Sequence, residues 1–214
     1  MFFSYVRYAF MHILKSLEYM RKKTILVTGS TGAIGLSISE YFYQKGYNVI
    51  INGKCKSSQL KSVKKKFKSS RALFFNIDLA KSSNVKRVIN ATVKKFKTID
   101  VLVNCAGIQY VERIEKYPEK VWRSMIDINL TTPYLFIKES LPFMRKYKFG
   151  RIINIASTHG LIASKKKSAY TASKHGLVGL SKVVALETAE ENITCNSICP
   201  GFVLTELIQD QIDV

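Results

Sequence analysis

The chain has 214 residues, of which 47% are hydrophobic and 11% aromatic, so it can bury a core and is too apolar to be disordered. Its net charge is +19, from 34 lysines and arginines against 15 acids. Lysine runs at 64–66 and 165–167 could bind nucleic acid or an anionic membrane. Because lysine is spread along the chain and does not interleave with aromatics, we expect a lysine-rich surface instead, with no nucleic-acid partner and no firm membrane association.

Residues 1–22 are predicted to be an extension, possibly helical, ahead of one domain over residues 23–214. The first twenty residues are apolar but include Arg7, Lys15 and Glu18, so no uncharged run is long enough to span a membrane. The segment also lacks the order typical of a signal peptide, which is a basic start, an apolar run and a cleavage site with small residues. An amphipathic helix lying on a membrane or a partner and a dispensable extension both remain open.

The cysteines and histidines do not predict a metal site. None of the cysteines forms a C-x-x-C pair, and the histidines are not spaced as ligands. We expect reduced, mostly buried thiols in a cytoplasmic protein. The residues concerned are Cys55, Cys105, Cys195, Cys199, His12, His159 and His175.

From Thr24 onward, short β-branched runs alternate with longer segments of helical period. Such apolar strands, separated by helices, indicate an α/β fold with a Rossmann-type, doubly wound parallel sheet. Six strands are predicted, at Thr24–Thr28, Tyr47–Ile51, Ala72–Asn76, Asp100–Asn104, Arg151–Ala156 and Ile193–Ile198. Helices are predicted near 34–45, 58–68, 82–97, 119–147 and 168–190.

A glycine-rich turn, Gly29–Gly35, joins the first predicted strand to the first predicted helix. Glycine suits a turn with positive φ and lets the backbone approach a phosphate closely. The following helix would offer free N–H groups and a positive dipole end to a pyrophosphate. This position in the chain therefore predicts a dinucleotide site.

Tyr170 and Lys174 are four residues apart on a predicted helix, so they share a face. A nearby ammonium favours the phenolate form of a tyrosine. Tyr170 could then accept the proton of an alcohol during oxidation or return it during reduction. Ser157, at the end of the fifth predicted strand, could hold the substrate oxygen by a hydrogen bond. No metal is required.

These motifs together resemble the short-chain dehydrogenase/reductase family. Thr28-Gly29-x-x-x-Ala33-x-Gly35 is similar to its T-G-x-x-x-G-x-G fingerprint, with Ala33 in place of the middle glycine. The resemblance implies catalysis by Ser157, Tyr170 and Lys174, with Asn129 supporting a proton-relay water. It implies cofactor contacts at Gly29, Thr31, Ile34, Gly35, Asp78, Leu79, Asn104, Ala106, Gly107, Tyr170, Lys174, Pro200, Gly201, Val203 and Thr205.

The stretch Ala156–Tyr170 resembles the subgroup of this family that oxidises D-3-hydroxybutyrate to acetoacetate, reversibly and with NAD, in ketone body metabolism. A charge-assisted hydrogen bond from Lys167 would anchor the substrate carboxylate. The resemblance implies substrate contacts at Gln109, Ser157, His159, Lys167 and Gln211.

Two alternatives remain open. Lys54 and Lys56 follow the second predicted strand where NAD enzymes carry an acid, which favours NADP and a 3-oxoacyl or ketone reductase. Family members also usually continue past the sixth strand with lid helices and a seventh strand, which are missing here. The chain could therefore be an inactive remnant that at most binds cofactor. The homo-oligomer typical of the full-length family is doubtful here, because the missing end often builds its interface.

Overall fold

The computed structural model describes residues 21–203, in which six parallel strands form one sheet. The strand order is β3-β2-β1-β4-β5-β6, and Leu26 of β1 pairs with Ile50 on one side and Leu102 on the other. The predicted doubly wound sheet is therefore confirmed, with strand ends differing by one or two residues. The strands are β1 (Thr24–Val27), β2 (Asn48–Gly53), β3 (Ala72–Asn76), β4 (Val101–Asn104), β5 (Gly150–Ile155) and β6 (Ile193–Ile198).

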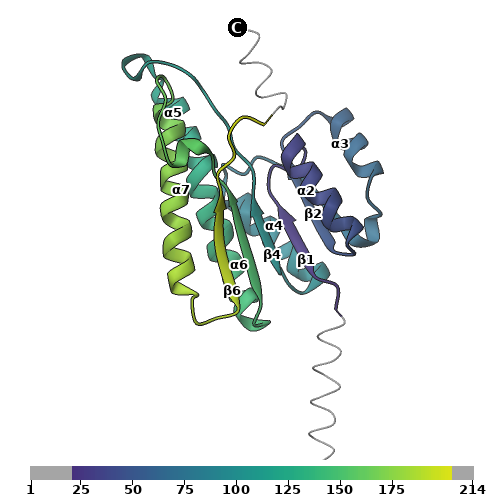
Figure 1. Ribbon diagram of the computed structural model, residues 1–214. Coiled ribbons are helices and arrows are strands. Elements are labelled where there is room, and N and C mark those ends of the chain that lie inside the picture. The colour runs from purple at the N-terminus through teal and green to yellow at the C-terminus, as the bar shows by residue number, and fades with distance from the viewer. Residues whose placement is uncertain (1–20, 204–214) are drawn as a thin grey trace, which may run out of the picture.

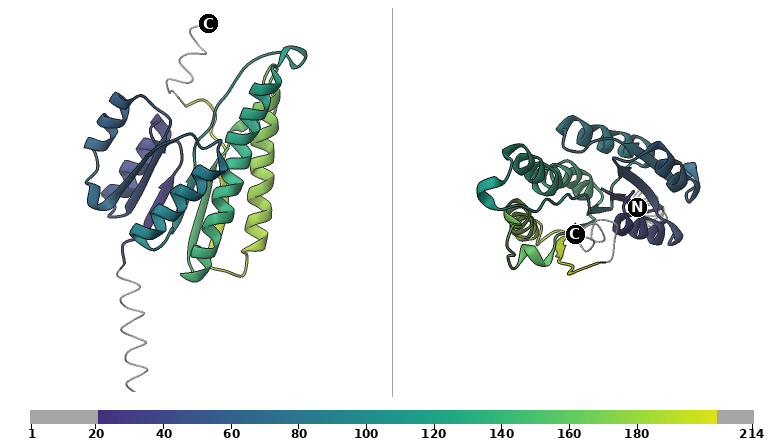
Figure 2. Two further views of the ribbon diagram at one scale, coloured as in Figure 1. Left: turned by 180° about the vertical axis from the view of Figure 1, so that it is seen from behind. Right: turned by 90° about the horizontal axis from the view of Figure 1, so that it is seen from above.

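Helices cover both faces of the sheet (Figures 1 and 2). Alternate residues of each strand point to opposite faces, so each face has its own core. Residues of α2 (Ala33–Gln44) and α3 (Ser57–Lys65) pack on one face, against Ile25, Val27, Val49 and Ile51. The other face, with Leu26, Ile50, Leu102 and Ile152, packs against α4 (Ser82–Phe96), α6 (Thr132–Lys146) and α7 (Ser168–Glu187).

The single helix expected near 119–147 is interrupted. It consists of α5 (Glu119–Ile126), a π-helical stretch (Asp127–Thr131) and α6. Pro133 has no N–H, so the carbonyl of Asn129 lacks its usual partner one turn later. The side-chain amide of Asn129 is buried at this point and exchanges two hydrogen bonds with the backbone of Ile108, at 2.9 and 3.0 Å. Hydrophobic periodicity does not reveal such a local widening, which is frequent at functional sites.

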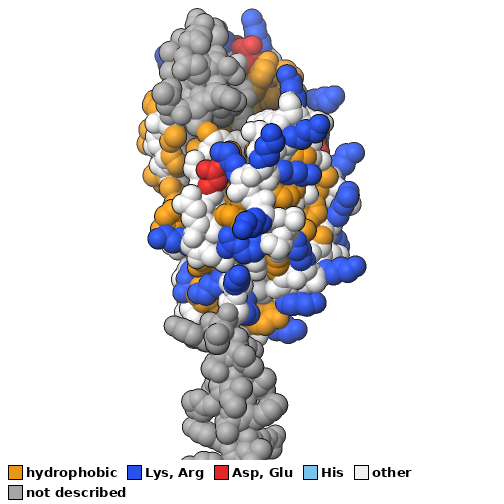
Figure 3. All heavy atoms as spheres, turned by 90° about the vertical axis from the view of Figure 1, so that its right-hand side faces the viewer, with side chains coloured by type: hydrophobic (Ala, Val, Ile, Leu, Met, Phe, Trp, Pro, Cys, Tyr) orange, Lys and Arg blue, Asp and Glu red, His pale blue; other side chains and the backbone are white. Residues whose placement is uncertain are grey.

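The positive charge is less evenly spread than we expected. Residues 41–99 hold fifteen lysines and arginines, and Asp78 is the one acid among them. These residues include α3, β3 and α4; β3 is an edge strand of the sheet, and α3 and α4 lie on its two faces. Figure 3 shows lysine and arginine side chains over much of the side that carries α3. The positive charge is therefore concentrated on part of the surface.

Some expectations differ in detail or fall outside residues 21–203. The four cysteines are free thiols, as expected, but they are less buried than expected. Cys195 is buried, whereas Cys55, Cys105 and Cys199 are half-buried. Within the described part of the chain, no helix is long and apolar enough to cross a membrane, and no group of three or more His, Cys, Asp or Glu could hold a metal. The extension, apart from Arg21 and Lys22, lies outside the described residues.

Candidate active site

A cleft of about 500 Å³ opens at the carboxyl ends of β1, β2, β3 and β4. This is where open α/β sheets bind ligands. Six of the predicted cofactor residues line it: Gly29, Thr31, Asp78, Leu79, Ala106 and Gly107. The sequence prediction missed other lining residues, namely Asn52, Gly53, Ile77, Ala80, Ile108, Ser124 and Ile128. Ser124 and Ile128 come from α5 and the π-helical stretch, where no sequence signal identifies them.

Gly29 begins the turn above β1 with a φ of +65°, a conformation that favours glycine. A Cβ at this position would also lie 2.7 Å from the Cα of Ala106. The hydroxyl of Thr28 accepts hydrogen bonds from the backbone N–H groups of Cys105 and Ala106, both at 3.0 Å. The glycine-rich turn and the loop after β4 are thereby held together as one wall of the cleft.

The first turn of α2 is suited to an anion. Its N-cap residue, Gly32, offers no side chain, and the first turn contains no acid. Its N–H groups are left to another partner. Ala33 begins the helix as an exposed residue and is not among those lining the cleft. The turn, the free N–H groups and the cleft together fit a dinucleotide.

Asp78 lies at the far end of the cleft, beside β2 and β3. One oxygen of its carboxylate pairs with the ammonium of Lys54 at 2.8 Å, and the other accepts a hydrogen bond from the N–H of Ala80 at 3.0 Å. The Lys54 hydrogen bond, followed by that from Ala80, holds the pKa of Asp78 below its ordinary value. Lys54 therefore does not present an unpaired charge here.

Lys174 is 4% exposed, and its ammonium donates a 2.8 Å hydrogen bond to the carbonyl of Ile155 at the end of β5. Burial lowers the pKa of Lys174 to about 8. The same ammonium lies 5.7 Å from the centre of the Tyr170 ring, so the four-residue spacing on α7 does place the two side chains together.

The pKa of Tyr170 is raised, opposite to the direction expected from a lysine neighbour alone. Burial raises it, and a hydrogen bond from the Ser157 side chain partly opposes the increase. The physical reason is that Tyr170 and Lys174 are both enclosed at the end of β5, so loss of water disfavours each charged form. Ser157 is itself buried, at 8% exposed.

Asn129 connects the catalytic side chains to the cleft. Its amide nitrogen donates to the hydroxyl of Ser173 at 3.2 Å, on the helix that carries Lys174. A Cβ at Gly107 would lie 3.4 Å from the amide oxygen of Asn129 and 3.7 Å from the ammonium of Lys174. Gly107, which lines the cleft, is therefore the point where the cofactor cleft meets the catalytic groups.

His159 lies beside the same centre. Its ring is 5.8 Å from that of Tyr170, edge to face, and its Nδ1 is 3.5 Å from the Ser157 hydroxyl. Burial, and then the positive charge of Lys167, lower the pKa of His159. Lys167 itself lines a separate hollow of about 400 Å³ between the loops at 112–115 and 164–168.

Several predicted site residues do not line the cofactor cleft. The side chain of Asn104 is buried and donates to Asn154 at 2.8 Å within the sheet. Gly35 packs on the turn, since a Cβ there would lie 2.7 Å from the carbonyl oxygen of Gly29. Pro200 accepts a hydrogen bond from the N–H of Thr158 at 2.9 Å, beside Ser157. Ile34 and Gln109 are half-buried, Gly201 and Val203 are exposed, and Thr205 and Gln211 lie outside the described residues.

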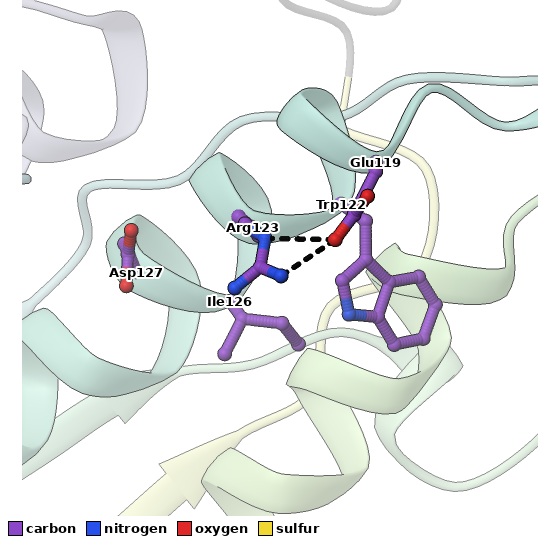
Figure 4. A pocket seen from close by; sticks show the side chains of 5 residues that line it. All are labelled: Glu119, Trp122, Arg123, Ile126 and Asp127. Atoms are coloured by element: carbon purple, nitrogen blue, oxygen red, sulfur yellow. Dashed lines mark hydrogen bonds and ion pairs between the residues drawn. The ribbon is translucent and has the colours of Figure 1, made fainter.

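Another hollow, of about 520 Å³, lies along α5 and contains none of the predicted site residues. Its lining is Glu119, Trp122, Arg123, Ile126 and Asp127, and Arg123 pairs with Glu119 one turn away on the same helix (Figure 4). It shares no lining residue with the cofactor cleft, although Ser124 of the same helix lines that cleft.

Comparison with known proteins yields consistent matches. A family model described as short chain dehydrogenase matches residues 23–213. The D-beta-hydroxybutyrate dehydrogenase of Cupriavidus necator is 44% identical over 192 residues, covering 89% of this chain and 74% of that protein. The 3-oxoacyl-[acyl-carrier-protein] reductase FabG of Staphylococcus epidermidis is 34% identical, covering 86% and 77%.

Solved structures agree with these matches. The structure described as ElxO with NADP bound has a TM-score of 0.82 at 33% identity, covering 90% of this chain and 78% of its own. A 4-hydroxyisoleucine dehydrogenase complexed with NADH has a TM-score of 0.78 at 30% identity, covering 89% and 80%. Both are cofactor complexes, one with each nicotinamide dinucleotide.

Proposed function

The chain belongs to the short-chain dehydrogenase family, and from this premise we propose that it oxidises D-3-hydroxybutyrate to acetoacetate, reversibly, with NAD. The observation that carries the proposal is the position of His159, whose ring lies 5.8 Å from that of Tyr170 and whose Nδ1 lies 3.5 Å from the Ser157 hydroxyl. The proposal assigns residues 23–214 to one dehydrogenase domain, working in the cytoplasm.

The cofactor would lie along the cleft from Asp78 to Gly107. The first turn of α2 and the bare backbone at Gly29 would hold its pyrophosphate, and Asp78 and Leu79 would contact its adenine end. When bound, the cofactor would supply the acceptor for the hydride lost from C3 of the substrate in oxidation. Gly107 supports this placement, because the cleft meets Lys174 and Asn129 there.

The protein side chains handle the proton. In oxidation, Tyr170 as phenolate takes the proton from the substrate hydroxyl while the C3–O bond becomes a carbonyl. Ser157 donates a hydrogen bond to the same oxygen and, before substrate arrives, to Tyr170. Burial raises the pKa of Tyr170, so the phenolate would depend on Lys174, which the carbonyl of Ile155 fixes 5.7 Å from the ring centre. Asn129 would support a water that relays the proton onward. In reduction the proton moves the opposite way.

The carboxylate of a short 3-hydroxy acid lies only two carbons from the reacting carbon, so a cation must be close to Tyr170. Lys167 would supply that charge, and His159 a hydrogen bond. Gln109 and Gln211 would complete this subsite. The 44% identical relative, named a D-beta-hydroxybutyrate dehydrogenase, supports this substrate.

The Lys54–Asp78 ion pair favours NAD over NADP. A 2′-phosphate needs an available cation, and Lys54 is already engaged by a carboxylate that would repel the phosphate. Lys56 is exposed nearby, and the 34% identity to a 3-oxoacyl reductase keeps an NADPH-dependent ketone reductase as the second candidate.

The test is an assay of NADH formation from D-3-hydroxybutyrate, with Tyr170→Phe as the inactive variant. Tyr134→Phe is the matched control, because Tyr134 is an exposed tyrosine on α6. Turnover lost in the first variant and kept in the second supports the proposal. Turnover confined to NADPH and 3-oxoacyl thioesters would instead identify the reductase. A folded protein that binds NAD without any turnover would identify a remnant.

A further inference from the structure

The edge of the sheet opposite the cleft is strongly basic. Because all strands are parallel, each connecting helix runs back from the carboxyl end of one strand to the amino end of the next. The carboxyl ends of the helices and the amino ends of the strands therefore lie together, on the side of the molecule that we call the amino edge. Contacts confirm this arrangement: Lys95 donates to the carbonyl of Ser69 before β3, and the Lys23 ammonium lies 3.9 Å over the Phe149 ring before β5. The cations of this edge are Lys22, Lys23, Lys45, Lys64, Lys65, Lys68, Lys94, Lys95, Lys97, Lys146, Lys148 and Arg151.

Acidic groups leave these cations largely unneutralised. Asp100 is buried and bound by Arg21, Glu40 pairs with Lys66, and Glu191 pairs with Arg145. Glu187 and Glu190, at the end of α7, are the exposed acids that remain at this edge, against the twelve cations. Three further cations at this edge, Arg21, Lys66 and Arg145, form ion pairs with acids, whereas the twelve listed above form none within residues 21–203. Helix dipoles favour lysine in a last helical turn, but Lys22, Lys68 and Lys148 lie outside the α-helices.

The N-terminal segment joins the protein at this same edge. Arg21 is fixed there by two hydrogen bonds to the buried carboxylate of Asp100, and its guanidinium lies 4.5 Å over the Tyr147 ring. Residues 1–20, which precede it, are rich in aromatic and aliphatic side chains. They also lie outside the part of the chain that matches the family. An apolar segment and a surface rich in lysine therefore meet at one place.

Contrary to the expectation from the sequence that the chain has no firm membrane association, we propose that the amino edge docks on an anionic lipid surface, with residues 1–20 inserted at the lipid interface and the lysines facing lipid phosphates. Neither signal alone holds a protein firmly to a membrane, but an apolar anchor combined with a polybasic surface does. A nucleic acid would account for the lysines and leave the apolar segment without a partner. In this orientation the cleft, which lies at the carboxyl ends of the strands, faces water.

The experiment is co-sedimentation of the full chain with phosphatidylcholine vesicles, with and without phosphatidylglycerol. We expect binding that requires phosphatidylglycerol and weakens as salt is added. Deleting residues 1–19, so that Met20 starts the chain, should weaken binding about tenfold or more. The triple change Lys22→Glu, Lys65→Glu and Lys94→Glu should do the same.

A matched control reverses the same number of exposed lysines on helix positions away from this edge, at Lys86, Lys120 and Lys138. It should change binding several-fold less than the amino-edge variant, with circular dichroism showing that all variants are folded. Equal losses in both triple variants, or binding that ignores the deletion, would overturn the proposal. So would an absence of binding to anionic vesicles, or binding to duplex DNA that matches vesicle binding. Turnover is not a readout, so the outcome is independent of the proposed activity.

Discussion

Replacing Lys174 by methionine should stabilise the protein at neutral pH while abolishing turnover. The side chain is 4% exposed, and burial brings its pKa from the ordinary 10.5 to about 8. Below pH 8 the lysine is protonated in both the folded and the unfolded chain, so the folded state carries the full cost of a buried ammonium. Methionine has a similar length and carries no charge.

The magnitude follows from the change in pKa. A fall from 10.5 to about 8 corresponds to about 3 kcal/mol of unfolding free energy, at roughly 1.4 kcal/mol for each pH unit. The variant loses the hydrogen bond to the carbonyl of Ile155, which costs about 1–3 kcal/mol. We therefore expect the variant to be more stable than the wild type by about 1 kcal/mol at pH 7.

The sign of the pH dependence is the sharper test. Between pH 8 and 10.5 the folded lysine has released a proton that the unfolded lysine still holds, so wild-type stability rises with pH relative to the variant. Urea unfolding at several pH values should show the difference between the two proteins shifting by about 3 kcal/mol across this window. Lys182→Met, at an exposed position on the same helix, should show no such shift. A constant difference between Lys174→Met and wild type would refute the reasoning.

Three other predictions concern binding. Gly29→Ala should weaken NADH binding, measured by calorimetry, by about tenfold or more, because the positive φ and close packing of Gly29 exclude a methyl group. Gly179→Ala, at a position with open space around it, should leave NADH binding unchanged. Asp78→Asn should release Lys54 and shift the ratio of NADP to NAD affinity upward, as cofactor titrations would show; an unchanged ratio would remove the ion pair from cofactor choice. Burial, and then Lys167, hold the pKa of His159 below the ordinary 6.5, so the KM for the hydroxy acid should begin to fall only at pH values below that, where His159 gains a charge that attracts carboxylate; a flat profile would contradict its role.

Local sequence patterns were sufficient to predict the parts of the site that are formed by residues close together in the sequence. The turn at Gly29 follows a strand and opens a helix, and Tyr170 and Lys174 share a helix face, so both could be predicted from the sequence. The electrostatics could not be. The pKa of Tyr170 depends on how far the end of β5 and the first turn of α7 exclude water, which is a property of the tertiary structure. The π-helical stretch likewise depends on Asn129 meeting Ile108, a residue of the loop after β4.

The direction of the surface charge is also a consequence of topology. Lysines that look dispersed in sequence are collected because a parallel sheet returns every connection to the same edge. Strands of four to six residues, at roughly 3.3 Å per residue, separate that edge from the catalytic edge by roughly 13–20 Å. This distance exceeds the Debye length of about 8 Å at physiological salt. The charge of the amino edge can therefore change with little effect on Tyr170 and Lys174, which leaves this edge available for a contact that the reaction itself does not require.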